Sequence, residues 1–268
     1  MSTLQILRIP KVQLTLFLLL IYLSALQTHN GLRYLTVFIF SVLFTIFFDL
    51  LFTFLRKKTL FIPYAALTTG VIISLTVNPS LPWYSIAFIA FIAMGIKIFL
   101  RINNRHIFNP AAAGLVIGGI LLRQPVSWWA VSFPINTTAP LLTSIKYLIL
   151  ISPLIVSAYR MRRYLTILAF LTLYTLLIAL SSHMFSVTSL AGTLIDPTVL
   201  FFAAIMLPEP MTSPFTLNRQ MLYGGFVAIL AVLFSFLPFT STILRANLLP
   251  DGLLPFLLVG NLLFFRFR

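Results

Sequence analysis

The feature that most constrains this chain is a succession of long apolar runs separated by short polar turns. A soluble domain has too little interior to bury a chain that is 60% hydrophobic and only 8% charged. Helices satisfy their own backbone hydrogen bonds inside a bilayer, so the runs are predicted to be membrane helices. The sequence thus predicts an all-α polytopic membrane protein with a single membrane domain over residues 1–268. About ten transmembrane segments are expected, at residues 12–27, 34–55, 61–77, 82–100, 110–122, 144–159, 164–182, 195–207, 220–238 and 252–265.

The positions of lysine and arginine support this count, because cytoplasmic loops carry an excess of both. If the N-terminus lies inside, 14 of the 18 cations fall at cytoplasmic ends and 4 at outer ends. We therefore expect both termini in the cytoplasm. The net charge of +14 is explained by attraction to anionic lipid in the bilayer and does not indicate nucleic acid binding.

Three of the runs are interrupted or unusually short. Residues 61–77 and 195–207 each end in a proline-punctuated polar loop, and residues 110–122 are too few to span a bilayer. Asn109 is predicted to cap this last helix, with Pro110 in its first turn. Its small residues, Gly114 among them, would let a neighbouring backbone or a flat ligand approach closely.

These interruptions fall at matching positions of two halves. Repeat one covers about residues 12–122, an outer loop covers 123–143, and repeat two covers about 144–265. Because five spans is an odd number, the two repeats would be inverted relative to each other. Short half-helices at matching positions of inverted repeats indicate a site near the midplane.

The ionisable residues give little sign of catalysis. Cysteine is absent and the three histidines are scattered, so no metal site, iron–sulfur cluster or catalytic residue is predicted. Asp49 lies within a span, which makes it a functional candidate, and the alternative is that it pairs with or turns toward Arg56 or Lys57. His106 is expected at the membrane interface.

Polar residues of the third span suggest a permeation path, with ordinary helix packing as the alternative. These residues are Thr68, Thr69, Ser74, Thr76 and Asn78.

Two motifs resemble the NqrB/RnfD family, the membrane subunits of sodium-pumping NADH:quinone reductase and of the Rnf complex. Residues 107–111, Ile-Phe-Asn-Pro-Ala, resemble the family stretch "NIFNPA", and residues 208–214 resemble its loop "TDPVTSP". A looser likeness covers the helix and turn at residues 67–83. The resemblance implies a urea-transporter-like fold of inverted five-helix repeats, in a prokaryotic cytoplasmic membrane. It also implies partner subunits of an Rnf- or Nqr-like complex, with quinone as a further candidate partner.

The family also attaches FMN covalently to an outer-loop threonine, and here this chain departs from the pattern. The candidate segment is Asn136 to Leu141, where Ala139 stands at the acceptor position and has no hydroxyl. Thr137 and Thr138 are the neighbouring hydroxyls, so we expect any flavin to be held without a covalent bond. The expected cofactor-binding residues are Thr137, Thr138, Asn109, Pro110, Gly114, Thr212 and Ser213.

The functional prediction is a membrane subunit that passes electrons through flavin and couples this to cation movement. Two alternatives remain open: a small-solute or ion permease of the urea-transporter-like fold without flavin, and a scaffold subunit of a redox complex. The sequence has no Gly-x-Gly-x-x-Gly motif, so electrons would have to come from partner subunits.

Overall fold

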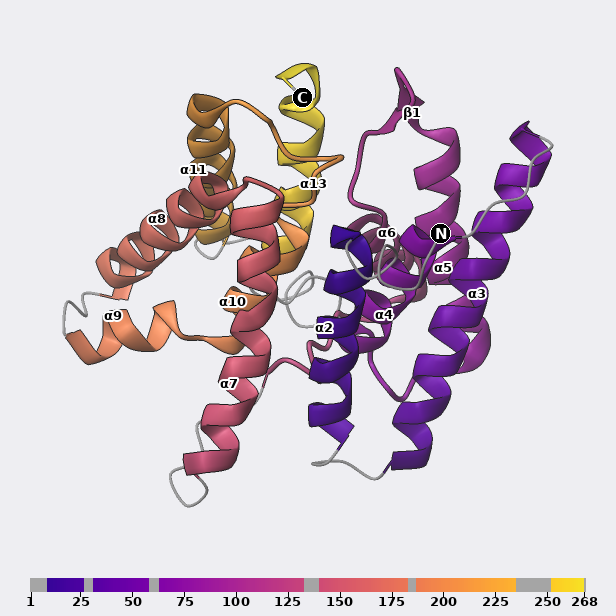
Figure 1. Cartoon of the computed structure of the whole chain (residues 1–268), viewed down its shortest axis with the longest axis horizontal. Helices are drawn as coiled ribbons and strands as arrows, with labels where there is room; N and C mark the ends of the chain where they lie inside the picture. Colours follow the sequence, from indigo (N-terminus) through magenta and orange to yellow (C-terminus); the bar gives the residue numbers. More distant parts are fainter. Residues whose placement is uncertain are drawn as a thin grey trace.

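The computed structural model describes residues 9–26, 31–57, 63–132, 140–182, 187–234 and 252–267. Within these ranges the chain is almost entirely helical, and its two halves lie side by side (Figure 1). Helices α2 and α7, one from each half, pack against each other at the junction.

The first half contains five helices and a short hairpin. The helices are α2 (Pro10–Leu26), α3 (Gly31–Lys57), α4 (Tyr64–Thr76), α5 (Trp83–Phe99) and α6 (Pro110–Leu122). The hairpin consists of β1 (Arg101–Ile102) and β2 (Arg105–His106), paired antiparallel. Asn103 and Asn104 form its turn with φ of 49° and 62°. Asparagine tolerates this left-handed backbone better than most residues, which explains the tight turn.

The second half is less regular. It contains α7 (Pro140–Ile155), α8 (Tyr164–Ser182), α9 (Val187–Leu194), α10 (Pro197–Phe201), α11 (Leu217–Leu233) and α13 (Leu253–Leu263). A π-helical turn η1 (Val156–Arg160) continues α7, another, η2 (Phe202–Met206), continues α10, and a 3₁₀ turn η5 (Phe265–Phe267) follows α13. Helix α9 and the β hairpin were not among the elements expected from the sequence.

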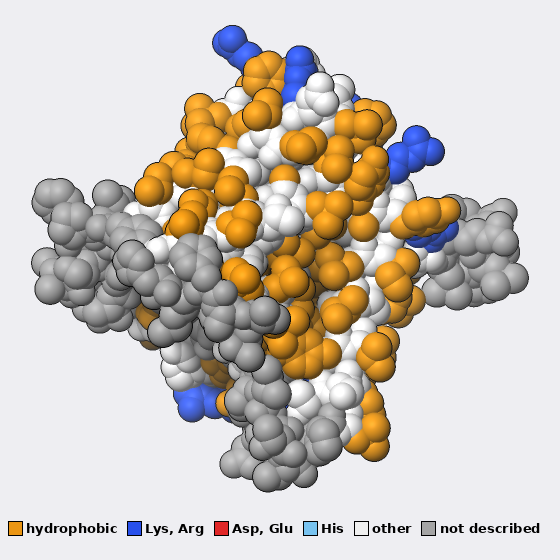
Figure 2. All heavy atoms as spheres, turned by 90° about the vertical axis from the view of Figure 1, so that its left-hand side faces the viewer, with side chains coloured by type: hydrophobic (Ala, Val, Ile, Leu, Met, Phe, Trp, Pro, Cys, Tyr) orange, Lys and Arg blue, Asp and Glu red, His pale blue; other side chains and the backbone are white. Residues whose placement is uncertain are grey.

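Three helices are long and apolar enough to cross a membrane, namely Gly31–Lys57, Leu141–Arg160 and Tyr164–Ser181, among the residues searched. The other apolar helices are shorter. The exposed surfaces of the three long helices are apolar: Leu43, Leu148 and Leu180, one on each, are more than half exposed. Figure 2 shows hydrophobic side chains across the face formed by the second half, with lysine and arginine near its edges. The chain is therefore an integral membrane protein with an all-α fold.

The short helices form the interior. Every residue of α4 from Thr68 to Thr76 is buried, as is all of η2. The segment after α6 covers the end of α4, because the backbone N–H of Ser127 donates to Thr76 O at 2.9 Å and Trp129 Nε1 donates to Ser74 O at 2.8 Å. Carbonyl groups left unpaired at a helix end are thus satisfied by protein at the centre of the fold.

Candidate functional site

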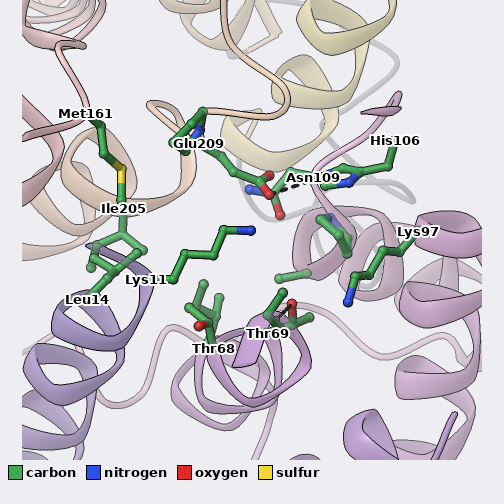
Figure 3. A pocket seen from close by; sticks show the side chains of 15 residues that line it. Lys11, Leu14, Thr68, Thr69, Lys97, His106, Asn109, Met161, Ile205 and Glu209 are labelled. Atoms are coloured by element: carbon green, nitrogen blue, oxygen red, sulfur yellow. Dashed lines mark hydrogen bonds and ion pairs between the residues drawn. The ribbon is translucent and has the colours of Figure 1, made fainter. Parts of the chain in front are cut away.

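The two halves enclose a cavity at their junction. It lies between α2, α4, α5, the loop that enters α6 and the loop after η2, and has a volume of about 50 Å³. Figure 3 shows Lys11 reaching into it from α2, with Thr68 and Thr69 pointing into it from α4. Leu14, Ile72 and Ile205 supply apolar wall. The site thus combines an apolar lining with a few polar groups, as ligand sites in proteins commonly do.

Asn109 ties three helices together beside this cavity. Its side chain accepts from Ala112 N at 3.2 Å and so caps α6, with Pro110 in the first turn as expected. The amide Nδ2 donates to Met206 O at 3.1 Å, and the backbone N–H of Asn109 donates to Asn261 Oδ1 at 2.8 Å. Helices α6 and α13 and the π turn η2 therefore meet through direct hydrogen bonds between protein groups.

His106 is buried within the protein and faces Glu209, and its position relative to the membrane interface stays a prediction. Its side chain is 4% exposed, and Nε2 lies 3.1 Å from Glu209 Oε1. The hairpin turn folds β2 back over the protein and brings His106 inside. Burial alone would raise the pKa of the Glu209 carboxyl, but the charges of His106 and Lys11 and the hydrogen bonds from His106 and Thr212 together outweigh it and hold this pKa below its usual value.

Thr212 and Ser213 build the loop that carries Glu209. The Thr212 hydroxyl donates to Glu209 Oε2 at 3.2 Å, and the Ser213 hydroxyl donates to the Glu209 backbone carbonyl at 2.8 Å. Arg163, which is also buried, donates from Nε to Ser213 Oγ at 2.8 Å. Both hydroxyls therefore position Glu209, and direct contact between them and a flavin stays a prediction.

Gly114 lies where α6 packs on α5. A Cβ added to Gly114 would stand 2.7 Å from both Ala93 Cβ and Ile89 O. This spacing is too close for any side chain, so the glycine permits the two backbones to approach. A contact between Gly114 and a cofactor stays a prediction.

Asp49 is paired with Lys97, so the expectation of a partner at Arg56 or Lys57 was wrong. Lys97 Nζ lies 2.7 Å from Asp49 Oδ1, and the two side chains are 9% and 0% exposed. Helix α5 packs along α3 and brings Lys97 level with Asp49 inside the protein. Charged groups at membrane depth are costly unless paired, and this pair meets that requirement.

The five polar residues of the third span divide into two groups. Thr68 and Thr69 line the cavity. Ser74 and Thr76 donate to backbone carbonyls of their own helix, and Asn78 accepts from Ser80 in the following turn. Thr68 and Thr69 likewise donate to carbonyls of their own helix, so only their place at the cavity separates them from the other three. A permeation path along all five side chains stays a prediction.

Thr137, Thr138 and Ala139 lie outside the described residues, so the flavin attachment segment stays a prediction. Among the residues that were described, no group of three or more metal-ligating side chains comes together.

Sequence reasoning missed Lys97, Asn261 and Arg163 as members of buried polar contacts. The available signal was that each is a polar residue within or beside an apolar run.

Comparison with protein families identifies the chain. A family model described as NQR2, RnfD, RnfE family matches residues 7–147, which include the whole first half and the start of α7. No curated protein matches significantly. The match covers more than half of the chain and includes Asn109, His106 and Lys97, so the protein belongs to the NQR2, RnfD, RnfE family of membrane subunits.

Proposed function

We propose that this chain is the membrane subunit through which an Rnf- or Nqr-type complex passes electrons by a non-covalently held flavin, coupled to cation movement. One observation carries the proposal. The two segments that resemble family motifs, 107–111 and 208–214, are far apart in the chain but meet at the same cavity. Asn109 belongs to the first segment and Glu209 to the second.

The lining has suitable chemistry for a flavin. Leu14, Ile72 and Ile205 offer apolar contact, and Lys11 offers a charged hydrogen-bond donor. The hydroxyls of Thr68 and Thr69 donate to Tyr64 O and Ala65 O, so their oxygens can accept hydrogen bonds from a ligand. A volume of about 50 Å³ holds only a few waters, so a flat ring needs this cavity to open. A wider cavity of about 380 Å³ adjoins it and shares Lys11, Ala65, Lys97 and His106. When bound, the flavin would supply one-electron chemistry, and the protein residues would bind it and exclude water.

We also propose the arrangement of the chain in the membrane: ten spans, two inverted repeats and both termini in the cytoplasm of a prokaryotic cell. Similar helix contacts in the two halves support the repeats. In the first half, α3 packs on α5, and in the second half, α8 packs on α11. Each contact joins the second and the fourth expected span of its half. Helix α5 packs on α6 and α11 on α13, which pairs the fourth and fifth.

Absorption spectra of the purified full chain test the proposal. We expect flavin bands that acid precipitation releases into the supernatant. Colour that stays in the pellet, with an FMN-sized mass added to a residue between 124 and 146, would replace our proposal with a covalent flavin. A colourless protein would favour the permease or the scaffold.

A variant that fills the cavity locates the flavin. Thr69→Phe is expected to lower the flavin content per protein, because the side chain at this position points into the cavity. Ser74→Ala is the matched control, since Ser74 is buried on the same helix but donates to Val71 O, away from the cavity. Equal flavin content in the two variants would place the cofactor elsewhere.

A further inference from the structure

The wider cavity, of about 380 Å³, carries a large excess of positive charge. Five cationic side chains line it together with one carboxylate, Asp49. These cations are Lys11, Arg56, Lys57, Lys97 and Arg101. If Glu209 of the adjoining cavity is included, five positive charges still face two negative ones, an excess of three.

The chain has few carboxylates left to balance this charge. Its four acidic residues are Asp49, Asp196, Glu209 and Asp251. Asp49 is bound to Lys97, Glu209 faces His106, and Asp196 caps α10 by accepting from Val199 N at 2.9 Å. Asp251, the fourth, lies outside the described residues. Most of the counter-charge must therefore come from another molecule.

Two guanidinium groups face this cavity from different elements. Arg56, at the end of α3, donates to the backbone carbonyl of Ile98. Arg101, on β1, has its Nε buried without a hydrogen-bond partner among the described residues. Burial, and then repulsion by Arg56, lowers the pKa of Arg101. Two like charges held together beside an unsatisfied donor favour an anion between them.

The positive-inside rule alone does not explain this cluster. That rule describes cations at the membrane surface, where lipid headgroups and water surround them. Arg56 and Lys57 are exposed, but Lys97 is buried and Arg101 is only partly exposed. The charge thus extends from the surface into the protein, as it does in sites that capture anionic ligands.

We infer that this cavity binds a phosphate group, with the guanidinium groups of Arg56 and Arg101 as its main donors. Arginine matches the geometry of phosphate with paired N–H donors, and one phosphate offsets up to two positive charges. The phosphate can come from a soluble phosphate ester or from the headgroup of an anionic lipid. The inference does not depend on flavin binding, because it rests on the charge and geometry of this cavity alone.

The test measures the melting temperature of the detergent-solubilised full chain as inorganic phosphate is added at constant ionic strength. We expect phosphate to raise the melting temperature, and Arg101→Gln to shift the half-maximal phosphate concentration upward by ~tenfold or more, because a lost charged hydrogen bond has about that effect. Arg105→Gln is the matched control. Arg105 is on the same hairpin but is exposed and does not line this cavity.

A parallel arm identifies the source of the phosphate. The full chain is reconstituted in phosphatidylcholine vesicles with and without phosphatidylglycerol. Stabilisation by phosphatidylglycerol but not by inorganic phosphate assigns the cavity to a lipid headgroup, and stabilisation by inorganic phosphate assigns it to a soluble ligand. If neither stabilises the protein, or if Arg101→Gln and Arg105→Gln respond alike, the inference is overturned.

The unliganded variants separate binding from folding. Arg101→Gln removes a partly buried charge that Arg56 repels and whose Nε has no hydrogen-bond partner among the described residues, so its melting temperature without phosphate should equal or exceed that of the wild type. A lower value would make Arg101 a structural residue and would count against the site. Arg56→Gln, measured in parallel, should also weaken the response to phosphate, which keeps the test independent of one variant. A colourless protein that still responds to phosphate would reject the flavin proposal and leave this inference standing.

Discussion

Replacing either member of the ion pair between Asp49 and Lys97 alone should destabilise the protein more than replacing both together. Asp49 is fully buried on α3, and the two charged atoms are 2.7 Å apart. Removing one partner leaves a buried charge, which typically costs ~3–5 kcal/mol. This loss of stability has an upper limit, because the group left without its partner can become neutral and so avoid a buried charge. Protonating an ordinary aspartate at pH 7 costs roughly 4 kcal/mol, since each pH unit is about 1.4 kcal/mol.

We therefore expect Lys97→Met and Asp49→Asn each to lower the free energy of unfolding by ~3–4 kcal/mol. The double variant should lose much less than the sum, because it leaves no charge unpaired. The assay is reversible unfolding by sodium dodecyl sulfate in mixed micelles at pH 7, analysed as a double-mutant cycle. A coupling energy of about 2 kcal/mol or more is the expected result.

Additive losses in the double variant would refute this reasoning, as would single variants that lose less than about 1 kcal/mol. Either result would mean that water or lipid headgroups solvate the two charges. Thr53→Val serves as a control for the neighbourhood. Thr53 is one helical turn from Asp49 and its hydroxyl has no partner among the described residues, so its loss should have little effect.

Three further predictions follow from the packing, the ion pair at the cavity and the topology. Gly114→Ala should lower the free energy of unfolding by ~1–3 kcal/mol, because the new methyl group forces α5 and α6 apart. Gly95→Ala should leave the stability unchanged or raise it, because its new methyl group would stand 3.8 Å from the nearest atom, and thermal unfolding compares the two variants. The pKa of Glu209 is lowered in the fold, so its stabilising effect is present above its ordinary pKa of 4.5 and is lost as the pH falls from that value through the lower pKa of the folded state. Between roughly pH 5 and pH 3, Glu209→Gln should therefore lose less stability than the wild type. Reporter fusions should read external after Asn136 and cytoplasmic after Arg163, and an external signal at the second position would contradict ten spans.

The positions of the helices were largely predictable because apolar runs in a membrane protein must be helical. The runs at 110–122 and 164–182 correspond to α6 and α8 at both ends. Asn109 was recognised as the cap of α6 from local chemistry alone, since an asparagine before a proline at a helix start has few other uses. The expectation that Gly114 allows close backbone approach likewise followed from the absence of a side chain.

The partners of buried polar groups were not predictable, because they depend on how helices pack in three dimensions. Asp49 had cations near it in sequence, at Arg56 and Lys57, and local spacing favoured these. The structure selects Lys97 from a different helix, 48 residues away. The contact of His106 with Glu209 was not predictable for a similar reason: the backbone of Asn103 and Asn104 reverses the chain and brings His106 into the protein.

The position of Asn109 also limits what it can do for a ligand. Its side chain has two donor hydrogens and an acceptor oxygen with two lone pairs. One donor is committed to Met206 O and one lone pair to Ala112 N, and both bonds hold the short helices together. A ligand in the adjoining cavity would share this group with the fold. Selectivity for that ligand must therefore come mainly from Lys11, Thr69 and the wider basic cavity. The motif that identifies the family thus serves first to hold the two halves in contact, and the cavity they enclose is its consequence.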